Sequence, residues 1–133
     1  MSRIIRASMA LLIVSHLFSP CFSADWPQFR GPNRDGISAE TGLLKSWPAG
    51  GPEKLWVSEA DLSDGFSSVS VVGDSIYTTG TLQGEGWLFA LDRKGRLKWK
   101  KKYGPEWTKN FPAARTTPTV DDGLLYIMSG MGL

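Results

Sequence analysis

Short apolar stretches separated by turn residues dominate the chain from residue 67 onward. Four of these stretches are rich in β-branched and aromatic side chains, and they cover residues 69–72, 76–79, 87–91 and 97–103. Glycine-containing turns separate them at residues 73–74, 83–86 and 94–95. This pattern is typical of strands joined by tight turns, and no stretch after residue 24 keeps a helical period. We therefore predict an all-β fold with four antiparallel strands in the unit.

The last of these stretches alternates between apolar and basic side chains. We expect Leu97, Trp99 and Tyr103 to point to one side, and the basic residues between them to point to the other. Seven basic residues fall within ten positions, namely Arg93, Lys94, Arg96, Lys98, Lys100, Lys101 and Lys102. Such a run could bind an anionic surface or nucleic acid. Lysine-rich faces also discourage edge-to-edge pairing of sheets, so we favour the solvated face of an outermost strand.

The strand pattern is copied along the chain. The text SSVSVV, GD and IY over residues 67–77 recurs as TTPTV, DG and LY over residues 116–126, an offset of 49 positions. Leu55-Trp56 recurs around Trp99 at an offset of 43, because the second connector is six residues longer. Four strands in a unit of about 40 to 50 residues indicate a β-propeller blade.

The copied unit carries a motif that resembles a known repeat. Residues 90–99 read ALDRKGRLKW, which looks like the AxDxxG…W motif of the pyrroloquinoline-quinone-type (PQQ-like) propeller repeat. The text of residues 67–80 and 116–130 is also similar to that family, and residues 25–36 (DWPQFRGPNRDG) look like the N-terminus of its exported members. The resemblance implies that Leu55-Trp56 is the outermost strand of a final blade. We thus expect an incomplete β-propeller with one closing strand, one four-stranded blade and half of a second, as the N-terminal fragment of a longer protein.

Four residues of the motif have structural roles that follow from their chemistry. Gly95 permits the tight turn before the last strand, and Asp92 can accept hydrogen bonds from turn N–H groups. Trp99 offers a flat face to a neighbouring blade, and Ala90 is small where strands or blades approach closely. We expect Ala90, Asp92, Gly95 and Trp99 to be structural, because each blade of a propeller needs them.

Residues 1–24 have the pattern of a cleavable secretory signal peptide. Arg3 and Arg6 precede an apolar stretch over residues 7–18, and small residues precede Ala24. A lipoprotein signal at Cys21 is the alternative, although Pro20 beside it fits that pattern badly. We therefore divide the chain into a signal peptide (1–24), an N-terminal segment (25–54) and partial propeller repeats (55–133), and expect a periplasmic or secreted protein without a transmembrane segment in its mature form.

Removal of the signal peptide also changes the chemical inventory. The only His, His16, and the only Cys, Cys21, both leave with it. Cleavage after Ser23 leaves 13 basic and 13 acidic residues in the mature chain, since Arg3 and Arg6 are lost. These losses argue against a zinc site, a His-dependent nucleophile, a disulfide and a nucleic-acid partner.

Candidate binding residues lie where the innermost strands begin. Arg115 could clamp a carboxylate or phosphate in the central channel of a propeller, and Ser67 and Thr116, with Ser68 and Thr117, could donate hydrogen bonds to a polar ligand. The competing interpretation is that Arg115 pairs with a loop carboxylate such as Asp64 or Glu106. No catalytic or metal-binding residue is assigned.

The resemblance leaves two functional interpretations. The first is an exported scaffold that binds or assembles protein partners, without catalysis of its own, similar to the propeller of outer-membrane-protein assembly; its nearest partners are the remaining blades. The second is the N-terminal part of a quinoprotein alcohol dehydrogenase, which would hold PQQ and calcium in the complete protein. We favour the scaffold, with no cofactor in this segment, because the family's ligands match no residue here.

Overall fold

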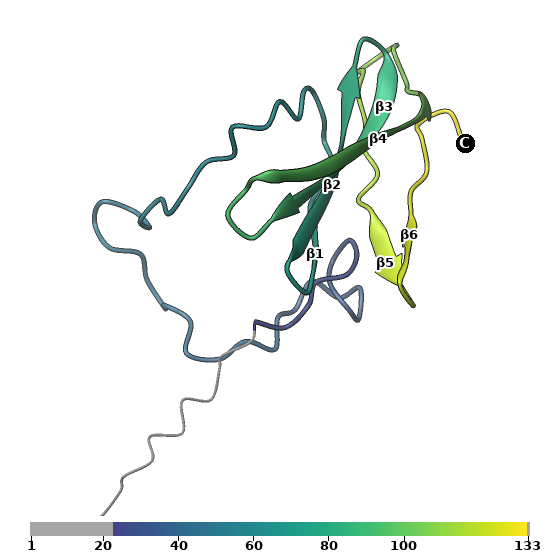
Figure 1. The fold of residues 1–133 in the computed structure, drawn as a ribbon. Helices are drawn as coiled ribbons and strands as arrows, with labels where there is room; N and C mark the ends of the chain where they lie inside the picture. The colour runs from purple at the N-terminus through teal and green to yellow at the C-terminus, as the bar shows by residue number, and fades with distance from the viewer. Residues whose placement is uncertain (1–22, 133) are drawn as a thin grey trace, which may run out of the picture.

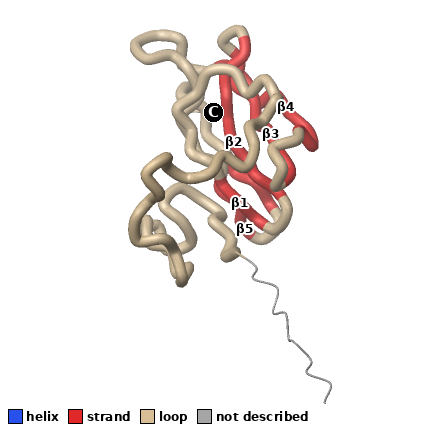
Figure 2. The backbone as a smooth tube through the Cα atoms, turned by 90° about the vertical axis from the view of Figure 1, so that its left-hand side faces the viewer, coloured by secondary structure: helices blue, strands red, loops and turns tan. Residues whose placement is uncertain are grey.

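The computed structural model describes residues 23–132, and within them it is all-β. These residues form six strands and no helix. The tube in Figure 2 accordingly has red strands and tan loops but no blue segment. In chain order the strands are β1 (Ser70–Val72), β2 (Ser75–Leu82), β3 (Glu85–Asp92), β4 (Leu97–Pro105), β5 (Thr119–Asp121) and β6 (Leu124–Tyr126). The predicted all-β class is confirmed, and each of the four predicted strands overlaps one of β1 to β4. The predicted signal peptide lies almost entirely outside the described residues.

Strands β1 to β4 form one antiparallel sheet in sequence order, as the turn pattern predicted. A separate two-stranded sheet, β5–β6, lies beside it (Figure 1). The turn of this second hairpin is Asp122-Gly123, and both residues have positive φ, 44° and 73°. An Asp-Gly pair in that conformation matches the twist of the flanking strands, which explains why the hairpin forms there.

Strand β4 departs from the predicted alternation. Leu91 pairs with Leu97 and its neighbour Ala90 pairs with Trp99, so that Lys98 is an extra residue in the ladder. Cross-strand partners share a face of the sheet, and a bulge of this kind shifts the facing of the residues beyond it. Leu97 therefore lies on the face of Leu91, whereas Trp99 lies on the face of Ala90. The prediction that Leu97 and Trp99 point to the same side is wrong for this reason.

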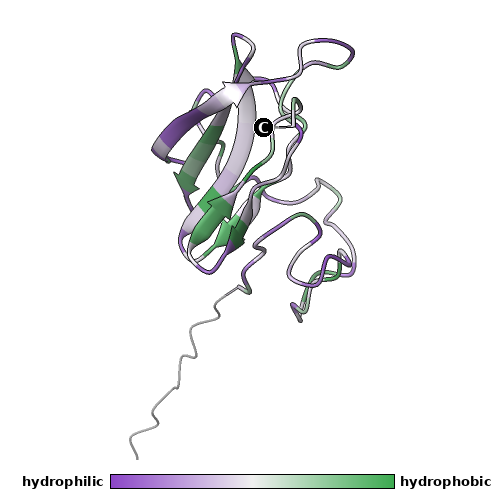
Figure 3. Ribbon diagram, turned by 90° about the vertical axis from the view of Figure 1, so that its right-hand side faces the viewer, coloured by the Kyte–Doolittle hydropathy of each residue, from purple (hydrophilic) through white to green (hydrophobic). Residues whose placement is uncertain are grey.

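The core is small and centred on β3. Phe89 and Pro118 are fully buried, and the other buried apolar side chains in the described residues are Leu88, Ala90, Leu91, Ala113 and Ala114. Strand β3 is buried because β2 and β4 flank it on both edges, whereas the first six residues of β4 are exposed. Figure 3 shows the contrast, with the lysine-rich β4 in purple beside apolar strand segments in green.

Residues 25–27 form an extended strip between the two sheets. Trp26 pairs with Val71 of β1 through two backbone hydrogen bonds, of 2.7 and 2.9 Å. One residue later, the carbonyl of Pro27 accepts a hydrogen bond from the backbone N–H of Val120 in β5, at 2.8 Å. The strip thereby joins the edge of the four-stranded sheet to the second hairpin.

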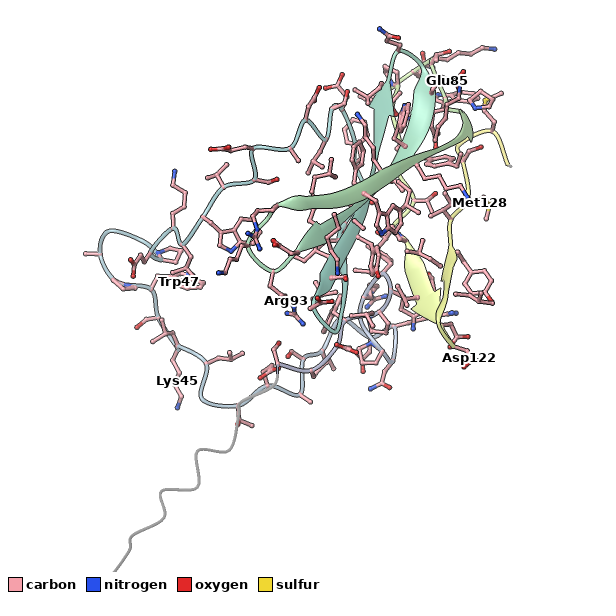
Figure 4. The ribbon with its side chains drawn as sticks, viewed as in Figure 1. Lys45, Trp47, Glu85, Arg93, Asp122 and Met128 are labelled. Atoms are coloured by element: carbon pink, nitrogen blue, oxygen red, sulfur yellow. The ribbon has the colours of Figure 1, made fainter. Side chains whose placement is uncertain are left out.

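A long loop over residues 36–62 arcs away from the sheet (Figure 1). Lys45 and Trp47 lie on its outer part, at a distance from the strands (Figure 4). Leu55 and Trp56, which the resemblance placed in an outermost strand, lie in this loop and belong to no strand. Among residues 23–132, no helix is long and apolar enough to cross a membrane.

Candidate functional site

The turn between β3 and β4 is built around the carboxylate of Asp92. Its Oδ1 accepts hydrogen bonds from the backbone N–H groups of Lys94 and Arg96, at 2.9 and 3.0 Å, and its Oδ2 accepts one from the Arg96 guanidinium at 2.6 Å. The backbone N–H of Arg96 is the largest cause that lowers the pKa of Asp92, and the Arg96 side chain and the Lys94 N–H lower it further. These bonds satisfy turn donors that have no strand partner.

Gly95 completes this turn and carries a second contact. Its φ is 77°, in the region where glycine is strongly favoured. The indole ring of Trp56 lies directly against it, so that a Cβ at position 95 would come within 2.6 Å of the ring. Ser58 Oγ also donates a hydrogen bond to the Gly95 carbonyl at 2.6 Å. A tryptophan from the preceding loop is therefore seated on the turn of the motif.

Ala90 lies between two aromatic residues on neighbouring strands. Tyr77 of β2 and Trp99 of β4 are its cross-strand partners. The two rings meet across Ala90, with centroids 6.1 Å apart and a tilt of 49°. A small side chain at this position lets the rings approach each other. Trp99 nevertheless remains 42% exposed.

Of the three residues proposed to line a channel, Ser67 and Thr116 lie in contact, whereas Arg115 is bound within its own loop. Ser67 Oγ donates a hydrogen bond to the Thr116 carbonyl at 3.0 Å, and Thr79 Oγ1 donates to the same carbonyl at 2.9 Å. The backbone N–H of Ser68 donates to Thr117 Oγ1 at 3.2 Å. The hydroxyl groups of Ser67 and Thr79 are thus engaged with backbone carbonyls, where they hold the two repeats side by side.

Arg115 is hydrogen-bonded within its own loop. Its guanidinium donates to the backbone carbonyls of Asn110, at 3.1 Å, and of Phe111. The expected pairing with Asp64 or Glu106 is wrong, because both hydrogen bonds of Arg115 go to its own loop. Arg115 also lines a hollow of about 280 Å³ beside Trp107 and Gly130.

Glu106, which the sequence suggested only as a partner of Arg115, is instead a buried acceptor of several hydrogen bonds. It is only 3% exposed, and its carboxylate accepts hydrogen bonds from the Tyr103 hydroxyl at 2.6 Å and from the backbone N–H groups of Gly130 and Trp107, at 2.8 and 3.1 Å. The carboxylate thus joins the end of β4 to the segment after β6. The only feature of the sequence that could have indicated this role is the Tyr-x-x-Glu spacing at the end of β4, and that spacing is not specific for a buried carboxylate.

Tyr103 gives this cluster a dependence on pH. Burial is the largest cause that raises the pKa of Tyr103 above its usual 10.0, and the hydrogen bond to Glu106 raises it further. In the unfolded chain the phenol ionises near its usual pKa, whereas the folded state resists ionisation. Its contribution to stability is therefore fully present below pH 10 and is lost as the pH rises through the folded pKa.

Replacement of Tyr103 by phenylalanine tests this dependence. At pH 7 we expect Tyr103→Phe to lower the free energy of unfolding by about 1 kcal/mol, because one hydrogen bond is lost. The difference in the free energy of unfolding between Tyr103→Phe and the wild type should become smaller above pH 10, because the wild type loses the contribution of Tyr103 there. Urea unfolding between pH 7 and 11 measures it, with Tyr126→Phe at an exposed position as the control. A difference that stays constant to pH 11 would contradict the role of Tyr103.

The lysines of β4 are partly neutralised within the sheet. Lys98 Nζ lies 3.2 Å from Asp74 Oδ1, and this hydrogen bond is the largest cause that lowers the pKa of Asp74. Lys102 Nζ lies 3.1 Å from Glu85 Oε1. Lys100 Nζ lies over the ring of Trp87, 5.2 Å from its centroid. These contacts are solvent-exposed and individually weak, but they reduce the positive potential that an anionic partner would meet.

The described part of the chain offers little to a metal-held cofactor. Within residues 23–132, no group of three or more His, Cys, Asp and Glu side chains is arranged to hold a metal ion. The arrangement does provide contacts between distant segments. The Trp56 ring packs on Gly95, the buried Glu106 carboxylate binds Tyr103 and Gly130, and the Ser67 hydroxyl binds the Thr116 carbonyl of the second repeat.

Comparisons with protein families, with curated proteins and with solved structures find no match to this chain.

Proposed function

We propose that the chain belongs to an exported β-propeller of the PQQ-like repeat type, which acts as a binding or assembly scaffold without catalysis of its own. In this proposal β1 to β4 are one blade and β5–β6 begin the next. The remaining blades and protein partners of the periplasm or cell exterior are the binding partners, and nucleic acid is not one of them. The proposal rests on how the two repeats contact each other.

The observation that carries the proposal is the spacing of these contacts. Gly65 forms a parallel bridge with Ala114, and hydrogen bonds join Ser67 to Thr116 and Ser68 to Thr117. The residues of each pair are 49 positions apart, which is the offset of the sequence repeat. Equivalent residues of two copies thus lie side by side and run in the same direction, as expected when blades repeat around an axis and each blade contacts its neighbours.

The contact of Trp56 with Gly95 supports the same proposal. Trp56 and Trp99 are equivalent in the sequence repeat, at an offset of 43 positions. Trp56 is seated on the turn of the next unit, and its contact with Gly95 is close enough to exclude a side chain there. By the same geometry we propose that Trp99, which is half-exposed, is seated on the corresponding turn of a further blade. Its exposed ring is then an interface between blades.

A cysteine cross-link tests whether the repeats lie side by side in solution. In a Cys21→Ser background, the Ser67→Cys, Thr116→Cys variant should be cross-linked within one chain by a short bismaleimide. The control pair Ser67→Cys, Asp122→Cys places the second cysteine about 20 Å further along an extended chain, so each cysteine should take up the reagent without being cross-linked to the other. Equal yields from the two pairs, measured by mass spectrometry, would overturn the proposed arrangement.

A second arm of the experiment separates the scaffold from the enzyme. The complete protein, supplied with PQQ and calcium, is assayed for dye-linked oxidation of alcohols and for quinone absorbance. A scaffold should give neither signal. Turnover that depends on both additions would replace the scaffold by the quinoprotein alcohol dehydrogenase, while leaving the arrangement of the blades intact.

A further inference from the structure

The residue that follows the predicted cleavage position, Ala24, makes a hydrogen bond within the described part of the chain. The backbone N–H of Ala24 donates a hydrogen bond to Glu40 Oε1 at 2.8 Å. The next side chain, Asp25, accepts a hydrogen bond from the Gly73 N–H at 2.9 Å, and Trp26 then enters its backbone pairing with Val71. Three consecutive residues are thus held by two parts of the molecule: Ala24 by Glu40, and Asp25 and Trp26 by the end of β1 and the turn that follows it.

Hydrolysis of the Ser23–Ala24 bond would change the character of the first of these contacts. Water supplies a hydroxyl group to the carbonyl carbon of Ser23, which leaves as a carboxylate, and the nitrogen of Ala24 becomes an ammonium group. A neutral amide with one N–H is thereby replaced by a cation with three donors at the same atom. Charge-assisted hydrogen bonds between ammonium and carboxylate groups are stronger than neutral ones.

Glu40 is well placed to receive this charge. In the part of the chain that the structure describes, the ion pairs are Arg96–Asp92, Lys98–Asp74 and Lys102–Glu85, so Glu40 has no Lys or Arg partner there. Its own backbone N–H is fixed by Ser38 Oγ at 3.1 Å. Glu40 is a half-buried residue in the first part of the long loop over residues 36–62, and its hydrogen bond to Ala24 is exposed to solvent.

We propose that removal of the leader creates an α-ammonium group at Ala24 that Glu40 binds as an ion pair. The pair ties the mature N-terminus, and with it the strip at residues 25–27, to the base of the long loop. The inference rests on the proposed export of the protein, but not on its being a propeller or a scaffold. It makes Glu40 a receptor for a group that exists only in the processed chain.

The test uses the full chain, exported by a bacterium that processes leader peptides. Intact mass and N-terminal sequencing of the exported protein should show Ala24 as the first residue. Amine-selective labelling at graded pH then gives the titration midpoint of the Ala24 amine. We expect the midpoint to lie about 0.2–0.7 pH unit higher in the wild type than in Glu40→Gln. The control Glu53→Gln removes the same charge from an exposed part of the same loop and should match the wild type.

Each outcome bears on a different part of the inference. Equal midpoints in the wild type and Glu40→Gln would overturn the ion pair while leaving processing intact. A mature chain that starts at another residue would overturn both the processing position and the pair. Retention of the whole chain inside the cell would overturn export itself, whereas failure of the cross-link between repeats would affect only the propeller. A difference that disappears in 1 M salt supports an electrostatic origin.

Discussion

Replacement of Phe89 by alanine is expected to lower the free energy of unfolding by about 3–5 kcal/mol. Phe89 is the largest fully buried side chain, at 0% exposure, and only six other apolar side chains, Pro118 among them, are buried in the described residues. With so small a core, the lost burial and the remaining cavity should remove most of the stability of the sheet. Urea unfolding followed by tryptophan fluorescence measures the change.

The matched control for this variant is Phe29→Ala. Phe29 is 60% exposed, so the same change of side chain should alter the free energy of unfolding by less than about 0.5 kcal/mol. Similar losses for the two variants would mean that β3 is not the centre of the core in solution.

Replacement of Gly80 by alanine is expected to be the next most damaging change, at about 3 kcal/mol. A Cβ at this position would overlap the backbone carbonyl oxygen of Leu62 and would lie 3.2 Å from the ring of Phe89. Neither neighbour can yield easily, because one is backbone and the other fills the core. The loop over residues 58–64 would therefore have to leave the sheet.

Gly50→Ala is the control for this second variant, since a Cβ at position 50 meets nothing within 4 Å. Its melting temperature should match that of the wild type, and limited proteolysis should cut it no faster. Gly80→Ala should be cut first near Leu62. Unchanged proteolysis of Gly80→Ala would show that the loop is not packed on β2.

The regular part of the fold could be predicted from the sequence because local signals determine it. Apolar stretches of strand length, separated by Gly-containing turns, placed all four strands of the first sheet and their antiparallel order. The offset of 49 positions marked equivalent residues of the two copies, and the structure adds that one such pair, Ser67 and Thr116, forms a hydrogen bond. Such patterns can be read from the sequence because each strand and each turn depends mainly on its own residues.

Features that depend on one extra residue or on a distant partner could not be predicted in this way. The bulge at Lys98 reverses the facing of Leu97, and strict alternation has no means of signalling an inserted residue. Arg115 turned to carbonyls of its own loop rather than to a carboxylate, because the loop geometry decides which acceptor lies within reach. The role of Glu106 depends on Gly130, which is 24 positions away, and only the folded chain brings the two together.

The strip at residues 25–27 has a consequence for the order of folding. Trp26 can pair with Val71 early, but Pro27 finds its donor only when Val120 is present, 93 positions later. The first part of the mature chain to be made is therefore among the last to be fixed in place, and until then the sheet edge at β1 is only half closed.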